Sequence, residues 1–320
     1  MRAVQVTSLS GPEHLEVRDV PEPVPGEDDV LIEVHAVGVS FPDLLLSRGE
    51  YQMKPEPPFS LGVDVAGTVV SGPGFAPGDR VAAVGGWGGA QERVAIHRDS
   101  VFALPDALSY AEGTALPMNY LTAQFTLAER AGLREGETVL VHGAAGGVGT
   151  ATIQVAKGYG ARTIAVVSNE EKGELARSAG ADEVVLLDGF KDAVKELTGG
   201  RGVDVVVDVV GGDVFTDSLR SLAPQGRLMV VGFAAGQGIP EVKVNRLLLN
   251  NVDVRGVGWG AYAMVRPGFM QQQWAELVPM IEAGTIKPPV GATYAFEEFG
   301  QALLDLDARK ALGKLAVLVR

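Results

Sequence analysis

The sequence predicts an α/β protein in which a doubly wound parallel sheet is inserted within a second, antiparallel β domain. Residues 1–117 form short alternating apolar runs separated by Pro and Gly clusters, a pattern typical of antiparallel strands and turns. From about Leu133 the pattern changes to strand, glycine loop and helix in repetition, which favours a parallel sheet covered on both faces. The last apolar run, residues 314–319, again has the character of a strand.

The composition bounds the class of protein. A chain of 320 residues is long enough for two domains, since single cores stop growing near ~250–300 residues. The net charge of −13 disfavours a nucleic-acid partner, because phosphate binding needs clustered Lys and Arg. The absence of cysteine excludes disulfides and thiolate ligands. No segment has the ~18 consecutive apolar residues of a membrane span or the pattern of a signal peptide, so we expect a cytoplasmic protein without membrane insertion.

The first domain is expected to be a compact, barrel-like set of antiparallel strands. Alternating strand candidates lie at residues 30–34, 64–70 and 92–96. We also expect residues 314–319 to rejoin this domain as a strand, which gives it the bounds 1–120 plus 258–320.

The second domain, residues 121–257, is expected to contain six parallel strands. Apolar strand candidates lie at residues 139–141, 163–167, 184–187, 205–207, 228–231 and 252–254. The segments between them have helical spacing, with one helical face formed by Phe215, Leu219 and Leu222. Two further helical faces follow in the tail: Trp274, Leu277, Val278 and Ile281, and then Phe299, Ala302, Leu303 and Leu306.

A glycine-rich loop between the first strand and the first helix of this domain is the strongest chemical signal. It runs from Gly143 to Gly149. A glycine turn at this place lets backbone N–H groups and the positive end of the helix dipole meet a pyrophosphate. The strand, loop and helix context favours dinucleotide binding over a merely structural turn, and the expected contacts come from Ala144, Gly146, Gly147 and Val148.

The end of the second strand indicates which dinucleotide binds. An Asp or Glu there would hold the ribose hydroxyls of NAD, but the strand ends Val167-Ser168-Asn169. Lys172 follows one helical turn later and offers charge to a 2′-phosphate. We therefore predict NADPH (NADP+) as the cofactor. The alternative is that Lys172 only belongs to a solvated helix face beside neighbouring glutamates.

Three later segments are expected at the ligand-binding edge of the same sheet. Val210 with Gly211, and Gly232 with Phe233, follow strands at their carboxyl ends, where ligands bind in this architecture. Trp259 follows the last strand and is expected to wall the site or to fill the core at the domain junction.

The chain resembles the medium-chain dehydrogenase/reductase superfamily over essentially its whole length. The motifs that carry the resemblance lie at residues 38–51, 61–67, 143–149 and 199–204, and the zinc-free NADPH:quinone oxidoreductase and zeta-crystallin branch fits best. The resemblance implies a Rossmann sheet inserted in a GroES-like antiparallel β-barrel catalytic domain. It also implies a homodimer that pairs the edge strand at residues 252–257.

The same resemblance bears on metal binding. Zinc alcohol dehydrogenases of the superfamily have a cysteine where this chain has Ser40, and a His-Glu pair where it has Val63-Asp64. A catalytic zinc requires three protein N, S or O ligands with one open position. The four histidines lack any recognisable ligand spacing, so we predict no bound metal.

These features together predict a reaction. Without a metal ion to stabilise an alkoxide, the interconversion of simple alcohols and aldehydes is difficult. A quinone or an α,β-unsaturated carbonyl spreads the charge of an incoming hydride over a conjugated system. We therefore predict hydride transfer from C4 of NADPH to a quinone or similar conjugated carbonyl, followed by protonation.

The resemblance also implies roles for single residues. Tyr51 is expected in the substrate pocket as a hydroxyl donor, and Ser40 stands where the branch often has Asn. Asp43 matches a polar residue below the nicotinamide, although it could also cap the helix that starts near it. Thr122 matches a residue packed near the nicotinamide ring, with a helix interior as the alternative. The branch often has tyrosine where this chain has Leu187.

Two alternative functions remain open. An enoyl-thioester or enone reductase would use the same scaffold with a different pocket shape; Arg48 and Lys54 are the only candidates for a basic entrance to its substrate site. A non-catalytic NADPH-binding protein, crystallin-like or RNA-binding, belongs to another class, and the acidic balance of the chain counts against RNA.

Overall fold

The computed structural model describes residues 1–320 and divides the chain into two compact units. Unit 1 comprises residues 1–118, 270–274 and 288–320, and unit 2 comprises residues 119–269 and 275–287. Unit 2 is therefore inserted within the sequence of unit 1, which confirms the predicted fold class. None of the helices combines the length and the apolar character that crossing a lipid bilayer requires.

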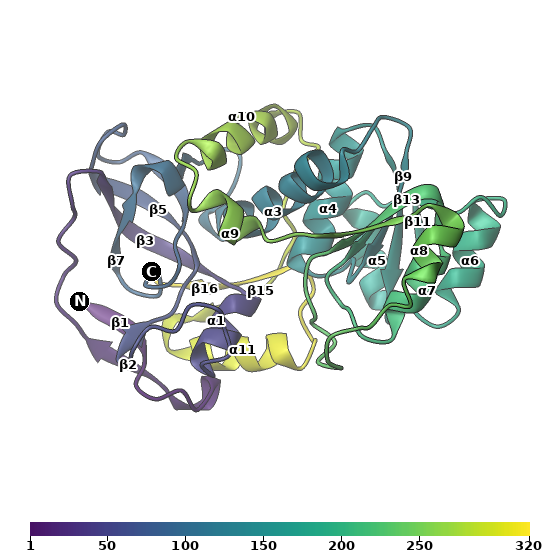
Figure 1. Cartoon of the computed structure of the whole chain (residues 1–320). Helices are drawn as coiled ribbons and strands as arrows, with labels where there is room; N and C mark the ends of the chain where they lie inside the picture. Colours follow the sequence, from purple (N-terminus) through teal and green to yellow (C-terminus); the bar gives the residue numbers. More distant parts are fainter. The chain divides into compact units, whose positions relative to one another are not determined.

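Unit 1 is built on a seven-stranded and a three-stranded sheet (Figure 1). The larger sheet has the order β15 (Val290–Ala295), β16 (Lys314–Leu318), β3 (Asp29–Val39), β5 (Asp64–Ser71), β6 (Arg80–Val84) and β8 (Val101–Ala103), with β7 (Arg93–His97) paired to β3. The smaller has the order β2 (Leu15–Asp19), β1 (Arg2–Val6) and β4 (Phe59–Ser60). All pairs are antiparallel except β15 with β16. The antiparallel pairing of β16 with β3 confirms that residues 314–319 rejoin the first domain.

Short helices complete unit 1. They are η1 (Pro12–His14), α1 (Phe41–Ser47), η2 (Arg98–Ser100), α2 (Tyr110–Gly113), η5 (Phe296–Glu298) and α11 (Phe299–Asp307). Helix α11 buries Phe299, Ala302 and Leu303, as its sequence pattern predicts.

Unit 2 contains the predicted six-stranded sheet, and every strand pair in it is parallel. The order is β11 (Glu183–Leu186), β10 (Arg162–Val167), β9 (Thr138–His142), β12 (Val203–Asp208), β13 (Leu222–Val230) and β14 (Asp253–Gly256). The helices that lie wholly or partly in unit 2 are η3 (Leu116–Tyr120), α3 (Leu121–Gln124), η4 (Phe125–Ala131), α4 (Gly147–Gly158), α5 (Glu170–Ser178), α6 (Phe190–Leu197), α7 (Val214–Arg220), α8 (Asn245–Asn250), α9 (Trp259–Ala263) and α10 (Phe269–Glu282).

The inner strands β10, β9 and β12 of unit 2 are buried on both faces, which is why they are largely apolar without alternation. Val139, Leu140 and Val141 are successive residues of β9, and all are fully buried. Phe190 of α6 and Phe215 of α7 belong to the apolar cluster on one face of the sheet. A parallel sheet covered in this way exposes only its strand ends and its edges, so ligands can reach it only there.

One predicted helical face ends earlier than expected. Phe215 and Leu219 lie on α7 and are buried, but Leu222 is the first residue of β13. The helix ends at Arg220 because the next residue, Ser221, already forms a backbone hydrogen bond with the neighbouring strand β12. Val203 N donates to Ser221 O at 2.9 Å.

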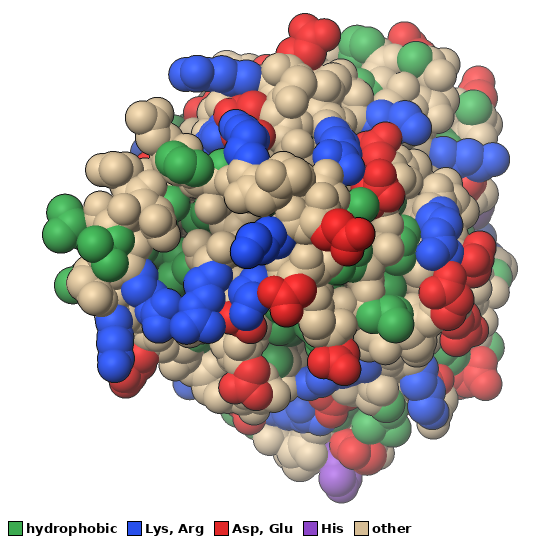
Figure 2. Space-filling model, turned by 90° about the vertical axis from the view of Figure 1, so that its right-hand side faces the viewer, with side chains coloured by type: hydrophobic (Ala, Val, Ile, Leu, Met, Phe, Trp, Pro, Cys, Tyr) green, Lys and Arg blue, Asp and Glu red, His purple; other side chains and the backbone are tan.

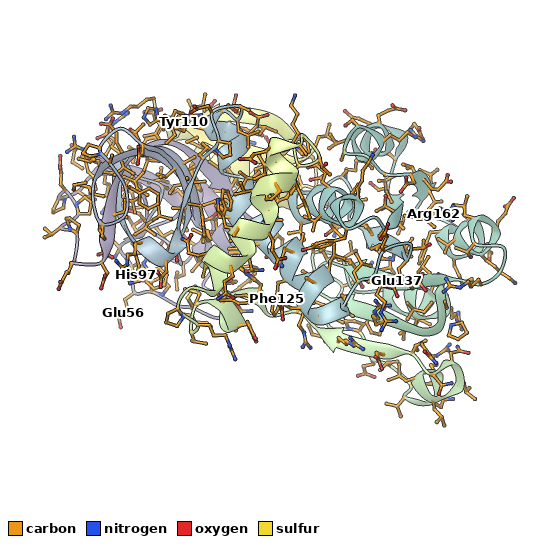
Figure 3. The ribbon with its side chains drawn as sticks, turned by 90° about the horizontal axis from the view of Figure 1, so that it is seen from above. Glu56, His97, Tyr110, Phe125, Glu137 and Arg162 are labelled. Carbon is orange, nitrogen blue, oxygen red and sulfur yellow. The ribbon has the colours of Figure 1, made fainter.

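The second unit extends beyond the expected boundary at residue 257. Residues 258–269 and 275–287 belong to unit 2. An aromatic cluster accounts for the first of these segments, since the ring of Phe125 (labelled in Figure 3) lies 5.0 Å from that of Tyr262 and 6.1 Å from that of Phe269. Side-chain packing, which no local sequence pattern encodes, sets the boundary.

The histidine at the end of β9 is buried in a way that fixes its protonation. His142 is 1% exposed, and its Nε2 lies 2.8 Å from Ser218 Oγ. Because the Ser218 hydroxyl donates to Val214 O, His142 Nε2 acts as the donor to Ser218 Oγ. Burial lowers the pKa of His142 from 6.5 to about 4, so the folded state favours the neutral ring.

We predict that the free energy of unfolding falls in acid because of His142. A folded-state pKa below the unfolded value means that the unfolded chain binds the proton first, so stability is lost as pH falls from 6.5 towards 4. Between about pH 7 and about pH 5 this loss amounts to about 2 kcal/mol. Urea unfolding of the wild type and of His142→Gln at both pH values measures it. An equal pH dependence in the two proteins would contradict the prediction.

Candidate functional site

The glycine loop of unit 2 is shaped by backbone requirements that only glycine meets. Gly143 follows β9 with φ of +61°. A Cβ on Gly149 would lie 2.2 Å from Gly143 O, so any side chain there would collide with the turn. The loop therefore brings the start of α4 directly against the end of β9.

The start of α4 leaves backbone donors open. Gly146 N donates to Gly143 O at 2.9 Å, and the first intrahelical bond runs from Thr150 N to Gly146 O at 2.9 Å. The N–H groups of residues 147–149 precede that bond and have no intrahelical acceptor. No side chain caps the helix at Gly146. Open donors at the positive end of a helix suit the diphosphate of a dinucleotide, so these residues fit a nicotinamide dinucleotide.

The loops after β12 and β13 lie next to the glycine loop and next to each other. A Cβ on Gly143 would lie 2.7 Å from Val209 Cγ2, and one on Gly211 would lie 2.8 Å from Phe233 Cδ1. Ala235 N donates to Val210 O at 2.9 Å. The structure thus brings the predicted residues Val210, Gly211, Gly232 and Phe233 together at the carboxyl edge of the sheet.

The end of β10 carries the residues predicted to select the cofactor. Ser168 and Asn169 follow the strand and are exposed. Asn169 Oδ1 accepts from Lys172 N at 3.0 Å, which places Lys172 in the first turn of α5. Glu170 is paired with Arg177 at 2.6 Å, so part of the negative charge beside Lys172 is already neutralised.

Thr122 and Trp259 are both buried in unit 2. Thr122 lies on α3, which packs against α4, and is 7% exposed. Its carbonyl accepts from Thr126 Oγ1 at 2.7 Å. Trp259 is the first residue of α9 and is 5% exposed.

The sequence reasoning missed one residue that shapes this edge of the sheet. Asp208, the last residue of β12, accepts from Val210 N at 2.8 Å and from Gly211 N at 2.9 Å. Burial raises the pKa of Asp208, and the two backbone bonds oppose that rise. An aspartate at the end of an apolar strand, three residues before a Gly-Gly pair, is the sequence signal that could have revealed it.

In unit 1, Asp43 organises the start of α1. It accepts from Ser40 N at 3.1 Å and from Gly62 N at 2.8 Å, so it caps the helix and also holds the loop at Gly62. Its side chain is fully buried, and burial raises its pKa to about 7 in spite of these two bonds. Burial and the negative charge of Asp43 raise the pKa of Tyr51. The Tyr51 hydroxyl therefore remains protonated and can donate a hydrogen bond.

A buried lysine that the sequence reasoning missed completes a polar cluster in unit 1. Lys314 Nζ donates to Ser40 Oγ at 2.7 Å and to Asp64 Oδ2 at 2.8 Å. The Ser40 hydroxyl in turn donates to Asp64 Oδ2 at 2.7 Å, and Met118 N donates to Asp64 Oδ1 at 2.9 Å. The single hydroxyl proton of Ser40 is thus committed to Asp64. A lysine within an otherwise apolar last strand is the signal for this cluster.

This donor set does not fit a catalytic zinc. Ser40 and Asp64 occupy the positions at which zinc dehydrogenases have metal ligands, but the ammonium of Lys314 already contacts both. Val63 offers no ligand atom. No group of three or more His, Asp or Glu side chains gathers in a way that could hold a metal ion, whereas zinc needs three such ligands.

Comparisons with known proteins agree with this geometry over the whole chain. The family model described as "Alcohol dehydrogenase GroES-like domain" matches residues 26–106, and the model described as "Zinc-binding dehydrogenase" matches residues 147–283. "Quinone oxidoreductase-like protein 2" of Rattus norvegicus is 37% identical, over 100% of this chain and 92% of the relative. "Quinone oxidoreductase" of Sus scrofa is 33% identical, over 100% and 98% of the two chains.

Solved structures give the same result. A probable oxidoreductase from Mycobacterium abscessus matches with a TM-score of 0.91 and 46% identity, covering 99% of this chain and 98% of the other. A mycobacterial protein complexed with NADPH matches with a TM-score of 0.90 and 35% identity, covering 99% and 100%. The chain therefore belongs to the quinone oxidoreductase-like branch of the medium-chain dehydrogenase/reductase superfamily, and it is an oxidoreductase.

Proposed function

We propose that the protein transfers a hydride from NADPH to a quinone or a similar conjugated carbonyl, without a metal ion. The observation that carries the proposal is the buried cluster of Ser40, Asp64 and Lys314, in which the lysine ammonium contacts both of the other side chains. An acceptor that delocalises the incoming charge does not require a Lewis acid. The names of the relatives and the NADPH-complexed neighbour support the same reaction class.

Each unit supplies a different part of the proposed chemistry. When bound, NADPH supplies the hydride. The open amides at residues 147–149 would hold its diphosphate, and the loops at Gly211 and Phe233 would line it. In unit 1, Tyr51 donates a hydrogen bond to the carbonyl oxygen of the acceptor. Asp43 and Ser40 position the start of α1, because the structure commits their polar atoms to Gly62 and Asp64.

The alternative of an RNA-binding protein has less support. Figure 2 shows acidic and basic side chains interspersed over the face on which α6 lies. A nucleic-acid surface instead requires basic residues that dominate a continuous area. The cytoplasmic location stays a prediction from the sequence.

We predict turnover of NADPH with a quinone by metal-stripped protein. Oxidation of NADPH and NADH is followed by absorbance with a quinone, an enone and an enoyl-CoA as acceptors. The highest kcat/KM is expected for NADPH with the quinone, and added zinc is expected to leave it unchanged. A preference for the enone or the enoyl-CoA would favour the alternative reductase. Inactivity with all acceptors, despite measured NADPH binding, would favour a non-catalytic role.

We predict that Lys172→Glu selectively weakens NADPH binding. A carboxylate in the first turn of α5 would repel a 2′-phosphate and remove a cationic partner, which corresponds to about a tenfold or larger increase in the Kd for NADPH. The Kd for NADH is expected to change little. The matched control is Lys157→Glu, which makes the same change at an exposed position in the last turn of α4, at the end away from the glycine loop. Equal losses for both dinucleotides would exclude a role in 2′-phosphate recognition.

We predict that Tyr51→Phe lowers kcat with a quinone by about tenfold, because one hydrogen bond to the developing oxyanion is lost. The Kd for NADPH is expected to be unchanged. Tyr110→Phe is the control, since Tyr110 (labelled in Figure 3) lies in unit 1 and stacks on His35 at 4.3 Å. An unchanged kcat in Tyr51→Phe would remove the hydroxyl from the mechanism.

We also propose a homodimer that pairs the free edge of the six-stranded sheet. Strand β14 ends the strand order and has no outer neighbour. Apolar side chains of α8 next to it are exposed, with Leu248 at 76% and Leu249 at 73%. Light scattering should give a dimer mass that Leu248→Glu with Leu249→Glu converts to a monomer mass. Val24→Glu, at a 92% exposed position of unit 1, should remain dimeric. A monomeric wild type would contradict the proposal.

A further inference from the structure

One buried amide of unit 2 lacks a hydrogen-bond partner. The side chain of Asn119 is 6% exposed, and its Nδ2 is buried without an acceptor. A buried donor that has lost its water without gaining a partner destabilises the fold. Such groups are rare in native structures, and each one that persists calls for an explanation, such as a bound water, a bound ion or a functional role.

The unpartnered nitrogen lies against the glycine loop. A Cβ on Gly147 would lie 2.5 Å from Asn119 Nδ2 and 3.0 Å from its Cγ, so alanine at this position would displace the amide. Gly147 is not among the glycines with positive φ, which means that its backbone conformation does not require glycine. The close approach of Asn119 to the first turn of α4 does require it.

Two other buried side-chain amides in unit 2, those of Gln154 and Gln124, have hydrogen-bond partners within the protein. Gln154 on α4 accepts from Tyr120 Oη at 2.7 Å, and its Nε2 donates to Lys287 O at 2.9 Å. Gln124 Nε2 donates to Glu276 Oε2 at 2.8 Å. Only the amide that borders the glycine loop is left with an open donor. The Asn119 amide, which comes from η3, thus lies beside the end of α4 where the backbone amides of residues 147–149 are open.

We propose that Asn119 is a cofactor-binding residue whose Nδ2 donates a hydrogen bond to a diphosphate oxygen of the bound dinucleotide. The inference rests on the proposed function, because it requires that the glycine loop binds NADPH. The amide of Asn119 is neutral, so it adds one hydrogen-bond donor to the backbone donors of the loop without placing a charge in the interior of unit 2. The negative oxygen supplies the acceptor that the ligand-free fold does not provide.

The test is Asn119→Leu, which keeps the size of the side chain and removes its donor. Titration of the purified protein with NADPH, followed by nicotinamide fluorescence, should give a Kd raised by about tenfold. Urea unfolding of the ligand-free variant should give a midpoint equal to or above that of the wild type, since an unpaired donor has been removed. A merely structural role would produce the opposite pair of results, with a lowered midpoint and an unchanged Kd.

Asn119→Asp provides a second, nearly isosteric variant if the leucine fails to fold. A carboxylate facing the diphosphate should raise the Kd for NADPH more than leucine does. Gln154→Met is the matched control, because it removes a buried, paired amide from α4, the helix whose first turn Asn119 approaches. It should lower the unfolding midpoint and change the Kd by less than about threefold.

The results distinguish a failure of the inference about Asn119 from a failure of the proposed function. Wild-type binding of NADPH together with unchanged Kd values in both Asn119 variants would overturn the inference and leave the proposed function standing. Failure of the wild type to bind NADPH or NADH would overturn the proposed function, and this inference with it.

Discussion

The buried ion pair of Asp64 and Lys314 is the interaction on which unit 1 depends. The two side chains are 0% and 3% exposed, so removing either partner would leave an uncompensated charge in the interior, at a cost of about 3–5 kcal/mol. Asp64 begins β5, Lys314 begins β16, and Ser40 precedes α1. Gly38 leaves the space for the lysine, since a Cβ there would lie 2.5 Å from Lys314 Cε. One charge pair thus aligns two strands and a helix.

The polar groups that the two units hold near their proposed sites differ in whether they have hydrogen-bond partners within the protein. In unit 1 the hydroxyl of Ser40 and the carboxylates of Asp43 and Asp64 are engaged with one another or with the backbone. These groups hold a rigid frame. In unit 2 the amides at residues 147–149 and the side chain of Asn119 lack internal acceptors. Polar groups that are satisfied internally stabilise a fold, whereas open donors grouped at one helix end are suited to binding an anion.

The sequence pattern predicts most of the fold because the relevant signals are local. Six apolar strands and the glycine loop are visible in windows of about ten residues, and the structure has the predicted sheet. The missed features depend on residues far apart in the chain. Lys314 contacts Asp64, which is 250 positions away in the sequence. Tyr262 belongs to unit 2 because its ring packs against that of Phe125. Asn119 is recognisable only once the structure shows that its nitrogen has no partner.

The place of β16 in the sheet has a consequence for the order in which the chain is synthesised. Translation completes residues 119–287, which contain all of unit 2, before β16 is made. Domains fold largely as units during synthesis, so unit 2 can form while the larger sheet of unit 1 still lacks a strand. That strand lies between β15 and β3, and it also brings the counter-charge of Asp64. A chain released by premature termination just before residue 314 would contain all of unit 2, but the larger sheet of unit 1 would lack the strand between β15 and β3.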